Sequence, residues 1–194
     1  MKLRFLTIIS LSFSTLIFAN QSFASLNVVS PTDASGAVPN KSFSESAIGA
    51  GLTAGFRFNL AEDIFTDSDD KNSKTKDHIF NEIEVFGNQF FSGEIKQNFG
   101  GRINLGYEIK GIRIYGSGGY VASTMDYQET ENTQQSIITS TPFFGVGLGY
   151  DITKNTSISL NSMLYNFDFA PKNSGFKSVE VNVLALTFGL AVHF

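Results

Sequence analysis

The last segment of the chain, residues 183–194, alternates strictly between two kinds of side chain. One set is bulky and apolar: Leu184, Leu186, Phe188, Leu190, Val192 and Phe194. The residues between them are small or weakly polar: Val183, Ala185, Thr187, Gly189, Ala191 and His193. A repeat of two predicts a β-strand, because successive side chains of a strand point to opposite faces. The two faces of this strand must therefore meet different surroundings.

The same alternation recurs along most of the chain. Its clear instances are residues 48–60, 78–90, 101–109, 112–121, 144–152 and 158–165. Glycines often occupy the second face, as Gly145, Gly147 and Gly149 do, so that face is also poorly suited to water. We therefore predict an all-β fold, an up-and-down antiparallel transmembrane β-barrel. Its bulky faces would meet lipid and its small faces would line a narrow interior.

The N-terminus has the features of an export signal. Lys2 and Arg4 precede an apolar run over residues 6–19, and Ser22 and Ala24 are small residues at the positions that define a cleavage site. We predict a signal peptide over residues 1–24. Residues 25–45 are rich in Ser, Pro, Gly and Asn and are predicted to be a linker with a weak strand at 26–30. The barrel is predicted over residues 46–194.

The connections between the predicted strands fall into two groups. Those at 110–111 and 153–156 are short and lie at one end, whereas those at 91–98, 123–141 and 168–177 are longer and lie at the other. Outer-membrane barrels show this pattern, with short periplasmic turns and longer external loops. Two features depart from it: a charged segment at 62–77 lies on the short-turn side, and only seven strands are clear. Because such barrels have an even number of strands, we predict eight strands, with the eighth in residues 25–45.

Several glycine- and aromatic-rich stretches resemble a known family. They are residues 100–107 (GGRINLGY), 112–120 (IRIYGSGGY), 144–150 (FGVGLGY) and the terminal Phe194. From about residue 48 onward the chain is similar to the small opacity/OmpA-type outer-membrane β-barrels. The resemblance implies a place in the outer membrane and contact with its lipid. It also implies that the barrel-insertion machinery recognises the last strand, through Phe188, Leu190, Val192 and Phe194.

Charged residues occur on the inward faces of the predicted strands. They are Arg57, Glu82, Glu84, Arg102, Glu108, Arg113 and Asp151. An eight-stranded interior is just wide enough for side chains to fill, and an isolated buried charge is costly, so each of these residues needs a partner. We expect Glu82 or Glu84 to pair with Arg57 or Arg102, and Arg113 to pair with Glu108 or Asp151. The set predicts a plug of salt bridges, with a gated polar pore as the alternative.

The composition excludes several classes of function. Removal of residues 1–24 changes the formal net charge from −4 to −6, because Lys2 and Arg4 are lost and no acidic residue is. No basic cluster is present, so we expect no nucleic-acid partner. The chain has no cysteine and only two histidines, His78 and His193, which lack the spacing of a zinc site. We expect no cofactor, no metal and no catalysis.

The resulting hypothesis is a surface protein of the outer membrane, with a structural or an adhesin- or antigen-like role exerted through its external loops. The segment 123–141 is the best candidate for contact with a host or environmental ligand, through Tyr127, Glu129 and Glu131. Three alternatives remain open: a narrow porin-like channel for small solutes, a soluble periplasmic β-barrel that binds an apolar ligand, and an enzyme acting on lipid A.

Overall fold

The computed structural model describes residues 21–38, 41–44, 47–62, 77–93, 95–130, 133–169 and 179–194. These residues form nine strands: β1 (Gln21–Val38), β2 (Lys41–Ser44), β3 (Gly49–Glu62), β4 (His78–Phe90), β5 (Ile95–Ile109), β6 (Ile112–Thr130), β7 (Thr133–Thr153), β8 (Thr156–Phe169) and β9 (Val179–His193). Within these ranges, no helix is long and apolar enough to cross a membrane.

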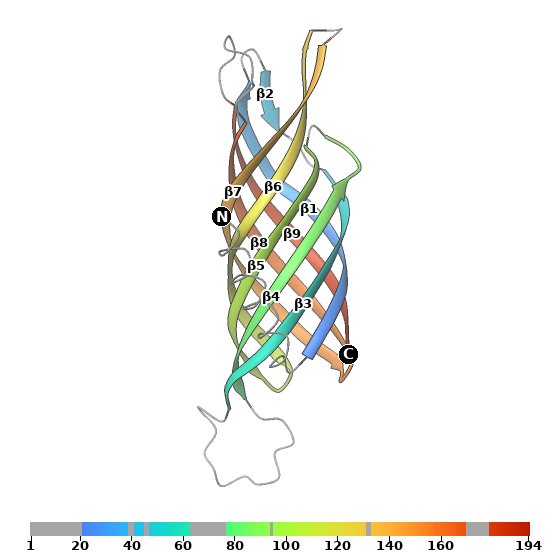
Figure 1. The fold of residues 1–194 in the computed structure, drawn as a ribbon, viewed down its shortest axis with the longest axis vertical. Coiled ribbons are helices and arrows are strands. Elements are labelled where there is room, and N and C mark those ends of the chain that lie inside the picture. The colour runs from blue at the N-terminus through green and yellow to red at the C-terminus, as the bar shows by residue number, and fades with distance from the viewer. Residues whose placement is uncertain are drawn as a thin grey trace, which may run out of the picture.

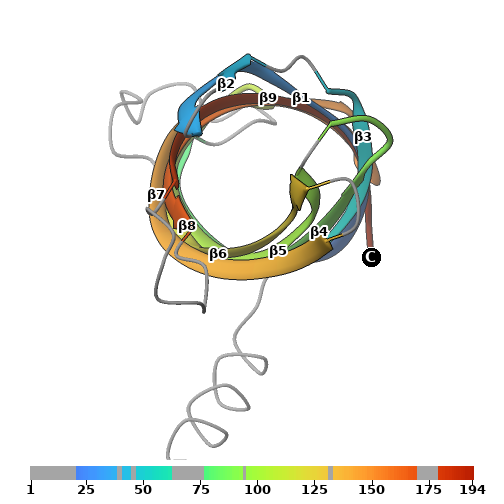
Figure 2. The ribbon, with the colours of Figure 1, turned by 90° about the horizontal axis from the view of Figure 1, so that it is seen from above.

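Eight of the strands close into a ring. β1 pairs with β3, each strand from β3 to β8 pairs with the next, and β9 pairs back to β1, with every pair antiparallel. Figure 2 shows the closed ring from its end. Among the described strands, β2 pairs with the far end of β1 alone, through residues such as Gly36 and Phe43. The prediction of an eight-stranded up-and-down barrel is therefore confirmed.

The eighth strand is β1, which extends well beyond the weak strand expected at 26–30. The alternation of bulky and small side chains along β1 breaks off after a few residues, because the pairing register with β9 shifts between Pro31 and Asp33. β1 also begins at Gln21, so Gln21–Ala24 belong to the barrel sheet in this structure. Residues 1–20 lie outside the described residues, and cleavage after Ala24 stays a prediction.

The alternation of side chains along each strand divides the barrel into two surfaces. On β3, Leu52 is 67% exposed, whereas its neighbour Thr53 is 6% exposed. On β9, Phe188 is 50% exposed and Thr187 is 4% exposed. The outer surface is therefore apolar and the interior mixed, which is the reverse of a water-soluble protein and confirms the orientation predicted from the sequence.

The two ends of the barrel differ in how the strands are joined. Figure 1 shows the C-terminus at the end opposite the tip of the β6–β7 hairpin. We call these the C-terminal end and the hairpin end. The C-terminal end holds the tight turns at Lys110–Gly111 and Lys154–Asn155. Lys110 and Gly111 have φ values of 52° and 79°, which explains the glycine, because L-residues rarely adopt this region.

The prediction of a long polar loop at 123–141 is wrong. β6 continues to Thr130 and β7 begins at Thr133, so nearly all of this segment is paired strand. The connection predicted at 91–98 is also shorter, because β5 begins at Ile95. In both segments the two faces do not differ clearly in hydrophobicity. The period-two pattern therefore did not predict strands there. The segment 63–76 and most of 168–177 lie outside the described residues.

Candidate functional site

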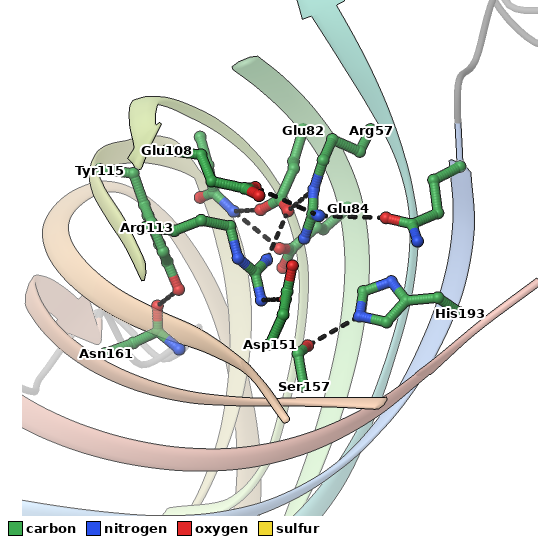
Figure 3. Close-up of polar contacts among 12 residues, drawn as sticks. Arg57, Glu82, Glu84, Glu108, Arg113, Tyr115, Asp151, Ser157, Asn161 and His193 are labelled. Carbon is green, nitrogen blue, oxygen red and sulfur yellow. Dashed lines mark hydrogen bonds and ion pairs between the residues drawn. The ribbon is translucent and has the colours of Figure 1, made fainter. Parts of the chain in front are cut away.

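The half of the interior toward the C-terminal end contains a network of ion pairs (Figure 3). Its first pair joins neighbouring strands: Arg57 on β3 lies opposite Glu82 on β4. The Arg57 Nε donates to Glu82 Oε1 at 2.8 Å, and its NH1 donates to the Gln21 side chain at 3.0 Å. The same NH1 lies 3.7 Å from Glu108 Oε2. Arg57 and Glu82 are both buried, so this pair lies away from water.

A second pair joins β4 to β5. Glu84 lies opposite Arg102 in the sheet, and the Arg102 Nε donates to Glu84 Oε2 at 2.5 Å. The guanidinium also lies over the ring of Phe86, with its Cζ 5.9 Å from the ring centroid. Its NH1 contacts Met163 Sδ at 3.4 Å on the far strand β8. Arg102 therefore spans the interior between the ion pairs and the apolar residues beyond them.

Arg113 on β6 connects the network across the barrel. Its NH1 donates to Glu82 Oε1 at 3.1 Å, and its NH2 donates to Asp151 Oδ1 on β7 at 3.0 Å. Glu82 therefore accepts from two arginines that come from different strands. The pairs Arg57–Glu82, Arg102–Glu84 and Arg113–Asp151 are among those expected from the sequence. The bond from Arg113 to Glu82 joins strands that are not neighbours, and no pattern in the sequence indicates it.

Asn104 on β5 was not singled out from the sequence, yet it lies at the centre of the network. Its Nδ2 donates to Glu82 Oε2 at 2.9 Å and to Glu84 Oε1 at 2.7 Å. Its Oδ1 accepts from the Ser117 hydroxyl at 2.7 Å. Asn104 is completely buried. Asn104 lies two residues after Arg102 and therefore on the same inward face of β5. That position is the one feature of the sequence that indicates its role, because a side-chain amide there can bridge two carboxylates.

Two further contacts lie toward the C-terminal end. His193 Nε2 and Ser157 Oγ are 2.7 Å apart, and the His193 ring lies 5.7 Å from that of Phe23. His78 Nε2 lies 3.6 Å from Glu108 Oε2. Among the residues that the structure describes, no group of three or more His, Asp or Glu side chains could hold a metal ion.

The half of the interior toward the hairpin end is mainly apolar and aromatic. The cluster comprises Val29, Ala47, Phe86, Phe90, Ile95, Val121, Met125, Phe143, Met163, Tyr165, Phe167, Phe169, Val181, Val183 and Ala185. Aromatic rings pack against one another within the cluster. The ring centroids of Phe143 and Tyr165 lie 5.2 Å apart, and Tyr165 stacks on Phe167 with a centroid distance of 5.8 Å. We call this set the aromatic plug. Phe167 and Phe169 lie at the edge of the segment 168–177, which was predicted to be a loop, so nothing in the sequence indicated their inward position.

The aromatic plug and the ion pairs occupy successive parts of the described interior. A cavity among the ion pairs has a volume of about 20 Å³ and is bordered by Glu82, Glu84, Arg102, Arg113 and His193, among others. A volume of this size holds about one water molecule. Gly147 on β7 leaves the space that the ring of Tyr115 occupies, because a Cβ atom at Gly147 would overlap that ring. The Tyr115 hydroxyl donates to Asn161 Oδ1 at 2.7 Å.

The other residues singled out from the sequence lie on the outside or at the hairpin end. Phe188, Leu190, Val192 and Phe194 all face outward, with exposed fractions of 50%, 46%, 54% and 75%. Tyr127 and Glu129 lie in β6, and Glu131 lies outside the described residues.

Comparisons with known proteins agree with this geometry at the level of the fold. No protein-family model matches the sequence, and no curated protein matches it. Solved structures do match. Ail, the attachment invasion locus protein of Yersinia pestis, has a TM-score of 0.51 and 12% sequence identity, over 90% of this chain and 98% of that one. Neisserial surface protein A has a TM-score of 0.53 and 11% identity, over 89% of this chain and 97% of that one.

A third structure adds to these two. The N-terminal β-barrel domain of OprF from Pseudomonas aeruginosa has a TM-score of 0.50 and 13% identity, over 88% of this chain and 97% of that one. This chain has the fold of the small outer-membrane β-barrels of the OmpA/opacity type. At these identities the likeness concerns the fold alone, so the role of such a barrel must be argued from its own residues.

Proposed function

We propose that this protein is an integral outer-membrane barrel with a closed interior, and that it acts at the cell surface through its hairpin end. The observation that carries the proposal is the filled interior. The ion pairs and the aromatic plug occupy successive levels of the barrel, and the cavity between them has room for about one water molecule. Such an interior conducts no solutes, so it serves as a support.

The apolar outer surface supports a place in lipid over the alternative of a soluble barrel. Large apolar side chains on it are between 39% and 75% exposed, from Ile83 on β4 to Phe194 at the C-terminus. Contiguous exposed apolar surface on this scale would cause aggregation in water. Washing membranes with alkaline carbonate tests this point, because an integral barrel stays in the membrane and a soluble barrel is released.

The packed interior distinguishes the proposed closed barrel from a narrow porin, which needs an open channel. We expect no steady single-channel conductance when the purified protein is added to planar lipid bilayers. A variant that replaces Phe86, Phe143 and Tyr165 with alanine, and Arg102 and Arg113 with alanine as well, opens both levels of the interior and is the control that should show leakage. Steady conductance of the unaltered protein would overturn the closed interior.

Catalysis has little support in the geometry. His193 and Ser157 form a hydrogen-bonded pair, but the cavity beside them has a volume of about 20 Å³, which has room for about one water molecule and for no substrate. The His193 Nδ1 has no hydrogen-bond partner among the described residues, so no carboxylate orients the ring as in a catalytic triad.

The orientation of the barrel can be tested on intact cells. The chain has no cysteine, so a single introduced cysteine can be labelled without background. We expect Thr130→Cys, at the tip of β6, to react with a membrane-impermeant maleimide on intact cells. Lys154→Cys, in a turn at the C-terminal end, should react only after the outer membrane is permeabilised. The reverse pattern would overturn the proposed orientation.

A further inference from the structure

The first four residues of β1, Gln21–Ala24, are paired on both sides like the rest of the strand. On one side all four lie opposite residues of β3. On the other side Phe23 lies opposite His193 of β9. The main chain of Ser22 exchanges two hydrogen bonds with that of Phe194, at 3.0 and 3.2 Å. These four residues therefore belong to the seam that closes the barrel.

Their side chains also continue the two faces of the barrel. Phe23 faces inward and is 6% exposed, whereas Ala24 is exposed on the outer face. The inward ring of Phe23 lies against Gly55 on β3, where a Cβ atom would come within 2.7 Å of Phe23 Cζ. The bulky residue on β1 and the glycine opposite it on β3 thus fit together as parts of one wall.

Two of the four residues contact the polar part of the interior at the C-terminal end. Phe23 borders the cavity among the ion pairs, and its ring centroid lies 5.7 Å from that of His193. His193 is 3% exposed. The Gln21 side chain accepts a hydrogen bond from Arg57 NH1 at 3.0 Å. Phe23 therefore covers His193, and Gln21 satisfies a donor of a buried guanidinium.

A mature chain that began at Ser25 would lose all of these contacts. Residues 54–57 of β3 and residues 192–194 of β9 would lose main-chain partners on that side. The outward side chains of Val192 and Phe194 are 54% and 75% exposed and apolar, so this part of the seam adjoins lipid. Unpaired main-chain groups beside lipid are costly. Removal of residues 1–24 would therefore open the seam where the barrel needs it closed.

The sequence offers an earlier place for cleavage. Ala19 is a small residue at the end of the apolar run over residues 6–19, and an export signal is cut after a small residue that follows such a run. Three positions before the bond stands Ile17, whereas Ser22 holds the corresponding place before Ala24. The sequence pattern alone favours the later bond, and the contacts of β1 favour the earlier one.

We propose that the export signal is removed at the Ala19–Asn20 bond, so that Gln21–Ala24 stay in the mature barrel and Phe23 closes its C-terminal end. Water adds across this peptide bond and leaves a carboxylate on Ala19 and an amine on Asn20. The inference rests on the proposed function, because an outer-membrane location requires export.

The mass of the intact protein tests the position of the bond. The full sequence is expressed in cells, and the protein is isolated from carbonate-washed membranes. We expect a chain of residues 20–194. A chain of residues 25–194, or the uncleaved chain, would overturn the inference. Release of the protein by carbonate would instead refute the membrane location, whatever its mass, so the two proposals can fail separately.

Two leucine substitutions form a matched pair for the same measurement. Ala19→Leu should yield no chain that begins at residue 20, because cleavage needs a small residue before the bond. Ala24→Leu should be processed as the unaltered protein is, since its side chain faces outward and has room to grow. Loss of processing in Ala24→Leu, with normal processing of Ala19→Leu, would overturn the inference.

Reaction of the histidines with diethyl pyrocarbonate tests the role of Phe23. The chain has only two histidines, so His78 serves as the internal reference for His193. We expect Phe23→Ala to raise the rate at His193 several-fold and to leave the rate at His78 unchanged, because the ring that covers His193 is lost. An unchanged rate at His193 would overturn the closure of this end by Phe23.

Discussion

At the residue scale, Glu82 has the most demanding position in the barrel. Its two carboxylate oxygens accept from Arg57, Arg113 and Asn104, and its side chain is buried. We expect Glu82→Gln to lower the free energy of unfolding by about 3–5 kcal/mol, because two buried guanidinium groups lose a shared anionic partner. Unfolding by urea in lipid vesicles measures this. Glu180→Gln, at an exposed position on β9, is the control and should change stability by less than about 0.5 kcal/mol.

Two glycines on neighbouring strands give a second test at this scale. A Cβ at Gly147 would overlap Tyr115 and crowd Asn161, whereas a Cβ at Gly116 meets no atom within 4 Å. We expect Gly147→Ala to destabilise the protein by about 1–3 kcal/mol through overpacking. Gly116→Ala should be neutral or should stabilise by up to about 1 kcal/mol, because alanine loses less conformational freedom on folding. Equal effects of the two substitutions in the same urea assay would contradict the packed interior.

At the element scale, β9 has two roles that can be tested separately. Its main chain closes the barrel, and its outward side chains form the proposed insertion signal. Phe194 is 75% exposed on its outward face, and its main chain pairs with Ser22 through bonds of 3.0 and 3.2 Å. If the insertion machinery reads the aromatic side chain, Phe194→Gln should slow assisted insertion several-fold. Phe144→Gln on β7 removes a similarly exposed ring, 68% exposed, and should leave the assisted rate near that of the unaltered protein. Insertion into vesicles with and without purified machinery measures both rates, and equal slowing would argue against a C-terminal signal.

The strands differ in how well they could be predicted from the sequence alone. Strands with one bulky and one small face, such as β3 and β9, could be placed from period two alone, because lipid and interior impose opposite demands on alternate residues. β1 and the segment 123–141, where β6 and β7 join, could not. Pro31 and Asp33 interrupt the pattern of β1, and residues 123–141 have polar side chains at both odd and even positions, so hydrophobic alternation is no guide there. The ion pairs across neighbouring strands were expected. Asn104 was not, although it lies directly opposite Glu82 in the ladder between β4 and β5. The Arg113–Glu82 bond joins β6 to β4, which are not neighbours, and therefore depends on the curvature of the sheet.

At the scale of the whole molecule, the closed ring predicts a change in electrophoretic mobility on heating. A folded barrel keeps its main-chain hydrogen bonds in cold detergent and runs as a compact particle, whereas a boiled chain runs at its full apparent mass. We therefore expect two bands, with and without boiling. The aromatic triple variant Phe86→Ala, Phe143→Ala, Tyr165→Ala should convert at a lower temperature. A single band under both conditions would contradict a closed barrel.

The seam between β1 and β9 has a consequence for synthesis. The first strand to leave the ribosome pairs with the last, from Phe23↔His193 to Gly36↔Val181. A nascent or truncated chain therefore has no partner for β1 and carries two open sheet edges, which invite aggregation. Contacts between the chain's extremes also make folding slow, since the longest loop must close before the seam forms. We therefore expect assembly of this protein to depend on factors that keep the chain unfolded until β9 is available to pair with β1.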